Sequence, residues 1–469
     1  MCVPLSFRLN LLIVMKKSLQ TAFLTWAAAT ILMALQLAAI YLRNGMDGLN
    51  LFIQQWPLSN LPVTLAATAL TWILAGALLY LLANDKVTKQ NAFQTAGFFL
   101  VFFSYLNIFR ERFRYGDYHY YFDAAIALSK GEALPATYLY LPLWASLLQF
   151  IVSLGDQGVM IVLWILNIIA LAVFYFLLIT ILQRYNFSRN LSVLITVLFL
   201  LINVPLLRTL GFIQVNLFVM DLILLSLLTY PKNTLLSALT LALAVHLKTS
   251  PAVIVLAFLL EFNWKWLFWF AVSFLFIGVF PVMVNGISPY YDYFNNAFLL
   301  TQLTTTNFHD TSFDSFFRFL NPFFGIQLEG TRIIVLVAKV LLLGATLFVM
   351  AQNIRGQSFS KENRLLNAAP SLFVFMTLGS PIVWDHHGIF VTLAFLLLLE
   401  RIHTPAHWMI FLAIYFLQFM LPSFDFFPWS YGRLFAPMIA LWLMYVTCRN
   451  EEPSPFITSA NQWLAKVAN

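Results

Sequence analysis

Polar side chains suited to acid–base or phosphate chemistry gather in four short clusters of an otherwise hydrophobic chain. The clusters occupy residues 110–123, 211–216, 246–251 and 380–387, and at least one apolar stretch separates each from the next. Ionisable groups at membrane depth are costly, so each cluster is a candidate functional site. We expect all four clusters to lie on one face of a membrane, where they can form a single active site.

Asp117 is the candidate general base of the first cluster, within Gly-Asp-Tyr-His-Tyr-Tyr-Phe-Asp. Partial burial raises the pKa of a carboxylate and neighbouring arginines lower it, and a pKa near the working pH suits proton abstraction. Asp123 is the rival base, because it lies further along the same predicted surface helix. The alternative role of Asp117 is structural, since aspartate is favoured as the N-cap of a helix.

The fourth cluster ends in adjacent histidines, His386 and His387, preceded by Asp385. Pro381 is expected to bend the chain just before them. Histidine titrates near neutral pH, and a neighbouring carboxylate can orient or charge it. Adjacent histidines point in different directions, and no HxxxH or DxD pattern accompanies them, so we expect no metal site. The alternative is a pair of interfacial histidines at headgroup depth.

Three further residues are candidate substrate ligands. Lys248 lies between two short apolar segments, where its ammonium group can hold a phosphate oxygen or snorkel to the membrane surface. Gln214 and Asn216 lie about one turn inside an apolar stretch. Their amides can hydrogen-bond sugar hydroxyls or join neighbouring helices.

The composition is that of an integral membrane protein. Hydrophobic residues make up 61% of the chain and charged residues 10%, with a mean hydropathy of +0.83, whereas soluble domains are about 25% charged. The net charge of +7 is distributed over short loops, where basic residues set topology and meet lipid headgroups, so we expect no nucleic acid partner. Cys2 and Cys448 lie near opposite ends, both predicted to be cytoplasmic, which excludes a disulfide in the outer loops.

We predict one integral membrane domain, residues 1–469, with an all-α polytopic transmembrane bundle of about 11 to 14 spans. Residues 1–14 are expected to precede a start at Met15, and the first span to serve as an uncleaved signal anchor. Basic residues in the inner loops place both termini in the cytoplasm. Asp221 and Lys339 lie inside spans and are expected to pair. The predicted spans are 19–42, 62–84, 91–109, 157–182, 190–206, 211–229, 234–247, 250–262, 264–284, 331–350, 365–384, 388–400, 406–422 and 431–447.

The outer face carries two long loops, residues 110–156 and 285–330. Within the first loop, residues 118–129 and 139–154 are predicted to form helices along the membrane surface. Three arginines of this loop break the positive-inside bias, which favours a role in binding an anionic headgroup or phosphate, with ordinary lipid contact as the alternative. They are Arg110, Arg112 and Arg114.

In chain order, the motifs resemble the signature of glycosyltransferase family 87, over a family-like core of about residues 91–400. Two departures are the spacing of Gly211 from Gln214, two residues longer than in the family, and Val383, where the family has serine. The matching motifs are Asp117-x-x-x-Tyr121 followed by Ala124-Ala125, Gly131 and Tyr140-Leu141-Pro142; Gly211 with Gln214-Val215-Asn216; Lys248-Thr249-Ser250-Pro251; and Ser380-Pro381-Ile382-Val383-Trp384-Asp385-His386-His387.

The resemblance implies a GT-C-type membrane enzyme with an inverting transfer from a polyprenyl-phosphate sugar, mannose first among the hexoses. It implies that neither a nucleotide nor a metal is required, so no cofactor is expected. Asp117 and His386 match the family's acidic and histidine positions and are the expected catalytic residues. The expected substrate-binding residues are Tyr121, Gln214, Asn216, Lys248, Asp385 and His387.

The chemistry of such a transfer adds two residues to the expected site. Charge develops on the leaving phosphate and needs cations, which Lys248 with Arg208 or Arg318 can supply. The expected partners are the lipid-linked donor, a glycan or glycolipid acceptor and membrane lipid, with the site on the extracytoplasmic face of the cell membrane. Two alternatives remain open: a flippase or other transporter of lipid-linked sugars, and an O-antigen polymerase or ligase.

Overall fold

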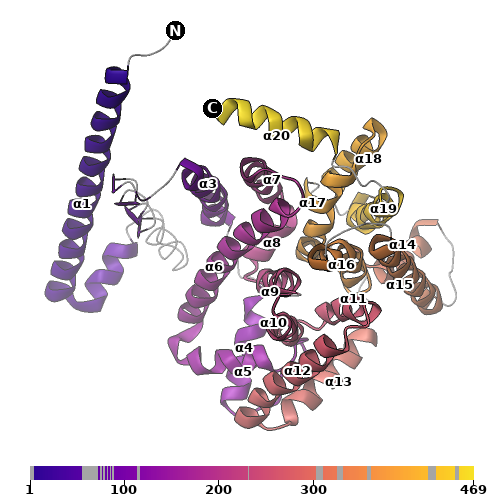
Figure 1. Ribbon diagram of the computed structural model, residues 1–469. Coiled ribbons are helices and arrows are strands. Elements are labelled where there is room, and N and C mark those ends of the chain that lie inside the picture. Colours follow the sequence, from indigo (N-terminus) through magenta and orange to yellow (C-terminus); the bar gives the residue numbers. More distant parts are fainter. Residues whose placement is uncertain are drawn as a thin grey trace. The chain divides into compact units, whose positions relative to one another are not determined.

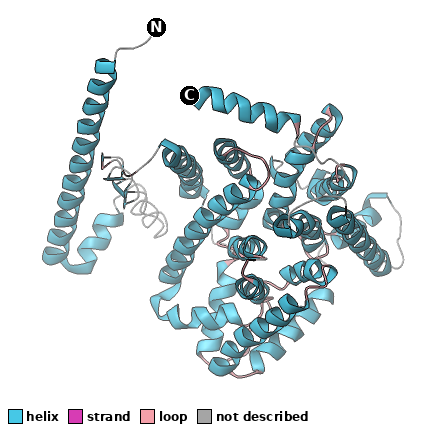
Figure 2. Ribbon diagram, in the orientation of Figure 1, coloured by secondary structure: helices cyan, strands magenta, loops and turns pink. Residues whose placement is uncertain are grey.

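The computed structural model of this 469-residue chain describes residues 5–54, parts of 72–86, 89–112, 117–230, 232–302, 310–324, 331–355, 361–420, 429–448 and 454–468. Every regular element in these ranges is a helix (Figure 1, Figure 2). The predicted all-α bundle is therefore confirmed. Helices suit this composition because each satisfies its own backbone hydrogen bonds, which lipid cannot do.

The chain divides into two compact units, Met1–Phe113 and Arg114–Asn469. The first unit contains α1 (Leu5–Gln54) and α3 (Lys89–Arg112). Within α1 the helical backbone is interrupted at Gly45, whose φ of 63° is readily adopted by glycine. The single predicted domain stays a prediction, and the predicted span 62–84 lies largely outside the described residues.

Four described helical runs are long and apolar enough to cross a membrane: Gln20–Gly45, Leu143–Gln183, Trp264–Asn285 and Thr331–Arg355. The chain is therefore a polytopic membrane protein. Most of the other predicted spans correspond to shorter or broken helices, so the total of about 11 to 14 spans stays a prediction.

One predicted span, 190–206, is broken into α7 (Arg189–Leu201) and α8 (Val204–Gly211), which meet at an angle of 65°. The side chain of Asn203 caps α8 by accepting a hydrogen bond from the backbone N–H of Leu206 at 2.9 Å. This bent pair is the fifth possible crossing among the described helices.

The second unit begins with α4 (Tyr118–Ser129), α5 (Leu143–Leu148) and the 3₁₀ helix η1 (Gln149–Leu154), which lie within the two segments predicted to be helical, 118–129 and 139–154. Their position along the membrane surface stays a prediction. Gly155, with a φ of 71°, turns the chain into α6 (Gly155–Gln183). The remaining helices are α9 (Asn216–Thr229), α10 (Thr234–Leu247), η2 (Ser250–Ile254), α11 (Val255–Leu260), α12 (Trp264–Asn285), α13 (Ser288–Gln302), α14 (Phe313–Phe324), α15 (Thr331–Arg355), α16 (Lys361–Leu378), η3 (Asp385–Val391), α17 (Thr392–Arg401), α18 (Pro405–Tyr415), the π-helix η4 (Phe416–Met420), η5 (Trp429–Tyr431), α19 (Gly432–Val446) and α20 (Pro455–Ala468).

The centre of the second unit is built around α9 and α10, which pack against each other, with α6 and α12 on their flanks (Figure 1). Buried hydrogen bonds join these helices in addition to their apolar contacts. The hydroxyl of Ser226 donates to the carbonyl of Ser237 at 2.7 Å, and the indole of Trp266 donates to the Ser237 hydroxyl at 2.9 Å. Such contacts connect helices in lipid, where polar groups find few other partners.

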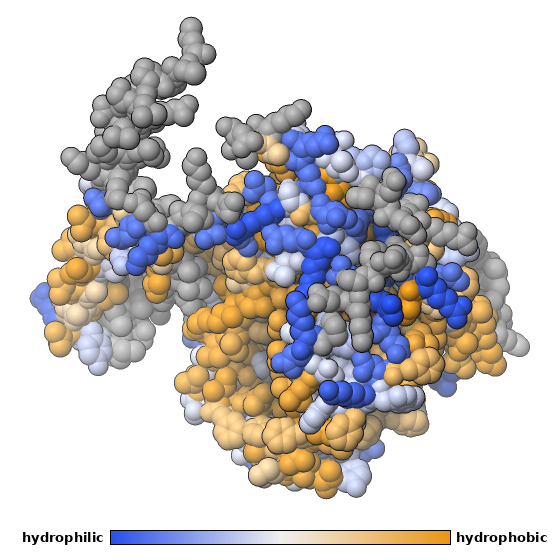
Figure 3. Space-filling view, viewed as in Figure 1, coloured by the Kyte–Doolittle hydropathy of each residue, from blue (hydrophilic) through white to orange (hydrophobic). Residues whose placement is uncertain are grey.

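Hydrophobic side chains dominate the lower half of the face shown in Figure 3. In α12, large apolar residues are exposed: Phe268 is 61% exposed, Phe276 76% and Met283 79%. Exposure on this scale is costly in water, so we assign these side chains to lipid.

Candidate active site

A cavity of about 330 Å³ opens in the second unit, between elements that are far apart in the sequence. It combines the start of α4, the end of α8 and the segment leading into η3. Residues of three of the four polar clusters therefore line this cavity. The lining residues are Asp117, Tyr120, Arg208, Phe212, Trp384, Asp385 and His386.

Asp117 precedes the first residue of α4, but its side chain does not cap that helix. The carboxylate instead accepts a hydrogen bond from the Gln214 amide, 97 residues away in the chain. The Gln214 carbonyl oxygen accepts from the hydroxyl of Tyr121 at 2.7 Å and from that of Tyr140 at 3.4 Å. These two donors fix the amide so that its NH₂ group faces Asp117, because a side-chain amide has one donor end and one acceptor end.

The environment of Asp117 suits a general base. Burial raises the pKa of its carboxyl, while the hydrogen bond from Gln214 and the positive charge of Lys248 act to lower it. The pKa is raised on balance, which brings it closer to a physiological working pH. Asp123, the rival base, is exposed on α4 and does not line the cavity.

Gln214 is presented by an unusual backbone turn between α8 and α9. Ile213, only 1% exposed, has a φ of 52°, which is rare for a β-branched residue because its Cβ crowds the backbone. The backbone N–H of Gln214 donates to the carbonyl of Thr209 at 2.9 Å and closes the turn. Strain of this kind is often concentrated at functional sites, where the surrounding packing must support it.

His386 is buried and is held through its backbone carbonyl. Its carbonyl accepts from Thr209 Oγ1 at 3.2 Å and from Asn216 Nδ2 at 3.4 Å. Burial, with the charges of Lys248 and Arg208, lowers the pKa of the imidazole well below its usual value. The ring is therefore neutral at pH 7 and can donate or accept a proton, but it does not supply a positive charge.

His387 has a different setting from its neighbour. Its Nδ1 accepts a hydrogen bond from the backbone N–H of Trp384 at 3.2 Å, and its ring stands at 81° to that of His386. His387 does not line the cavity. We therefore assign the contacts of His387 to stabilising the segment that carries Asp385 and His386, and not to binding a ligand.

Lys248 and Asn216 lie behind the cavity wall. The ammonium group of Lys248 donates to Oδ1 of Asn216 at 2.8 Å, and Asn216 in turn contacts the His386 carbonyl. Neither side chain is among those that line the cavity. Burial lowers the pKa of Lys248 to about 7, against the opposing effect of Asp117. Lys248 thus acts electrostatically on Asp117 and His386 in this structure, and the predicted direct contact with phosphate remains a prediction.

Asp385 is held by two arginines, and sequence reasoning missed one of them. Arg433 Nη1 lies 2.6 Å from Asp385 Oδ1, and Arg208 Nε lies 3.9 Å from Oδ2. Arg433 belongs to α19, inside the predicted span 431–447. An arginine at membrane depth is itself the signal that identifies such a residue as a functional candidate.

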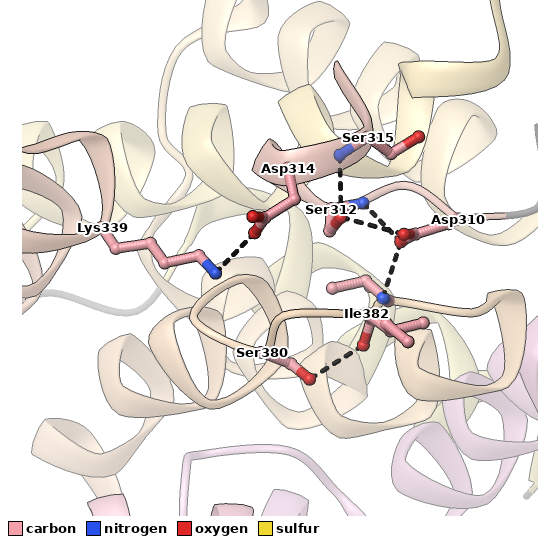
Figure 4. Close-up of polar contacts among 8 residues, drawn as sticks. Asp310, Ser312, Asp314, Ser315, Lys339, Ser380 and Ile382 are labelled. Carbon is pink, nitrogen blue, oxygen red and sulfur yellow. Dashed lines mark hydrogen bonds and ion pairs between the residues drawn. The ribbon is translucent and has the colours of Figure 1, made fainter. Parts of the chain in front are cut away.

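The segment before η3 is anchored by the start of α14 (Figure 4). Asp310 Oδ1 accepts from the backbone N–H groups of Val383 at 2.9 Å and Ser312 at 3.0 Å. Thr311 N–H donates to the carbonyl of Val383 at 2.8 Å. These bonds fix the segment that leads to Asp385 and His386.

Several predicted residues lie away from the cavity. Lys339 pairs with Asp314 at 2.8 Å (Figure 4), so the expected pair with Asp221 is wrong. Arg318 is half-buried on α14 and does not line the cavity. Within the described ranges, no three His, Cys, Asp or Glu side chains are grouped as a metal site requires. The side chains of Arg110, Arg112 and Arg114 fall outside what the structure describes.

Comparison with known proteins yields one match. A model described as glycosyltransferase family 87 matches residues 138–381, just over half of the chain. Asp117 and His386 lie shortly before and shortly after the matched range. No curated protein and no solved structure matches the chain.

Proposed function

The chain belongs to glycosyltransferase family 87 and is a membrane glycosyltransferase, and on that premise we propose that it transfers a hexose from a polyprenyl-phosphate donor. Mannose is the first sugar to test, because the sequence motifs resemble those of mannosyltransferases. The proposed acceptor is a hydroxyl of a lipid- or glycan-linked sugar, and the proposed site faces the extracytoplasmic side of the cell membrane.

The observation that carries the proposal is the arrangement of Asp117 and Arg208 on the wall of one cavity. A carboxylate that is not used as a helix cap, with a raised pKa, is available to take a proton. An arginine that is 44% exposed offers the fork of donors that phosphate prefers. A base and a phosphate-binding cation in one space are what transfer from a phosphate-linked sugar requires.

The proposed reaction is a single displacement. The acceptor oxygen attacks the anomeric carbon as Asp117 takes its proton, and the bond from that carbon to the phosphate oxygen breaks. The electron pair leaves on polyprenyl phosphate, whose growing charge Arg208 stabilises. Neutral His386, on the same wall, hydrogen-bonds the acceptor or the sugar. Attack opposite the leaving group inverts the configuration at the anomeric carbon.

The proposal is tested with purified enzyme in proteoliposomes, given a panel of radiolabelled polyprenyl-phosphate sugars and an extract of membrane glycolipids. Transfer from one donor, with the opposite anomeric configuration in the product, is expected. Transfer from no donor, together with transport of one across the bilayer, would replace the proposal by a flippase.

We further propose that the reaction needs no divalent metal, because arginine supplies the charge that a metal would otherwise provide. Treatment of the active enzyme with a chelator is expected to leave the initial rate unchanged. A rate that falls and is restored by magnesium or manganese would contradict this part of the mechanism.

A further inference from the structure

Behind the cavity wall lies a buried ion pair between Asp385 and Arg433. The side chains are 8% and 6% exposed, and Nη1 of Arg433 lies 2.6 Å from Oδ1 of Asp385. Asp385 also lines the cavity, whereas Arg433 does not. Burying two charges is costly unless their geometry is good, so the pair calls for an explanation beyond stability.

Arg433 is held from a second side by an irregular helix. Its Nε donates to the carbonyl of Gln418 at 3.2 Å. Gln418 lies in the π-helix η4, and such turns are frequent at functional sites. The approach of η3 to this turn is close, since a Cβ added at Gly388 would lie 2.6 Å from the Gln418 amide nitrogen. The guanidinium group therefore has a fixed place and orientation.

Asp385 has a second and looser arginine neighbour, Arg208. Nε of Arg208 lies 3.9 Å from Asp385 Oδ2, which is longer than the roughly 2.8 Å of a direct charged hydrogen bond. Arg208 is 44% exposed and lines the cavity, with its guanidinium 5.7 Å from the Phe212 ring. Its loose contact with Asp385 orients it without consuming its donors.

We propose that Arg433 is a positioning residue that neutralises Asp385 and so keeps Arg208 available for the phosphate of the lipid-linked donor. This inference rests on the proposed function, because it takes a prenyl phosphate as the ligand of Arg208. Without Arg433, the buried Asp385 carboxylate draws Arg208 into a direct ion pair and away from the cavity. When Asp385 loses its charge together with Arg433, it no longer attracts Arg208, which is again available for the phosphate.

The test measures the affinity of the purified full-length protein for farnesyl phosphate, a short prenyl phosphate whose binding requires no transfer. Loss of a charged hydrogen bond to phosphate lowers affinity by about tenfold or more. We expect that loss in Arg208→Gln and in Arg433→Met. The double variant Arg433→Met with Asp385→Asn is expected to regain affinity to within about threefold of wild type, a coupling that only a shared mechanism produces.

A matched control is a buried arginine that does not line the cavity. Arg401 is 4% exposed and donates to the side chains of Asn353 at 2.8 Å and Asn367 at 2.9 Å. Arg401→Met is expected to lower the thermal unfolding temperature but to leave the affinity for farnesyl phosphate unchanged. If Arg433→Met does not fold, Arg433→Gln replaces it, with the same expected loss of affinity.

Two results would overturn the positioning role. One is wild-type affinity in a folded Arg433 variant, and the other is a double variant that stays as weak as Arg433→Met. Absence of farnesyl phosphate binding to the wild-type protein would overturn it as well. Sugar transfer is measured separately, so a protein that binds the phosphate through Arg208 but transfers no sugar refutes the proposed function and leaves the affinity comparison valid.

Discussion

Replacing Gln214 by methionine is expected to move the pH dependence of the reaction, and not only its rate. Methionine keeps the approximate volume of the side chain but removes the amide that donates to Asp117. A hydrogen bond to a charged group is worth about 1.5–3 kcal/mol, and one pKa unit corresponds to about 1.4 kcal/mol. Because the amide favours the carboxylate form of Asp117, its loss raises the pKa of Asp117 further.

The sign of the effect on activity follows from the role of Asp117 as base. Only the carboxylate form accepts a proton, so activity rises with pH through the pKa of Asp117. In Gln214→Met the acidic limb of kcat/KM is expected to shift to higher pH by about 1–2 units. The activity approaches the wild-type level again at pH values above the new pKa.

The assay is the initial rate of transfer from the lipid-linked donor between pH 4 and pH 9, in buffers of constant ionic strength, with values about one pH unit apart. Tyr121→Phe removes one of the two hydroxyls that orient the amide and is expected to give a smaller shift in the same direction. Gln149→Met is the matched control, because its half-buried amide donates to the carbonyl of Ser146 at 3.1 Å, away from Asp117. An acidic limb that stays in place while the rate falls at every pH would refute the reasoning.

Three further outcomes are expected. Asp117→Asn should lower the initial rate of transfer by about 10²–10⁴-fold and leave donor affinity unchanged. Asp123→Asn, at an exposed position of the same helix, is the control, and a normal rate in Asp117→Asn would remove Asp117 from the mechanism. His386→Ala should lower kcat by about 10²-fold, whereas His387→Ala should mainly lower the unfolding temperature, and equal effects on kcat would contradict their different settings. Asp310→Ala should lower the free energy of unfolding by about 2–4 kcal/mol, because buried backbone N–H groups lose their acceptor. Asp310→Asn retains an acceptor oxygen and should lose less stability. Equal losses of stability in the two variants, measured by thermal unfolding, would disprove this account.

The class of the protein follows from its sequence alone. A chain with 61% hydrophobic and 10% charged residues must bury its backbone groups in helices if it enters lipid, and the structure confirms the all-α bundle. The polar clusters were visible because charges are rare in such a chain. Their grouping as one candidate site is expected from the sequence, and residues of three of the four clusters line one cavity.

The partner of each polar group was decided by tertiary structure. Asp117 has the sequence context of a helix cap, yet its carboxylate meets Gln214, which the bent α7–α8 pair and the strained Ile213 bring to it. Lys248 has the context of a phosphate ligand, yet it lies behind the wall on Asn216. Arg433 of α19, 48 residues further along the chain, forms a buried ion pair with Asp385. Periodicity and composition describe one helix at a time, whereas these contacts depend on how distant helices pack, because a buried polar group takes whichever partner the packing places within reach.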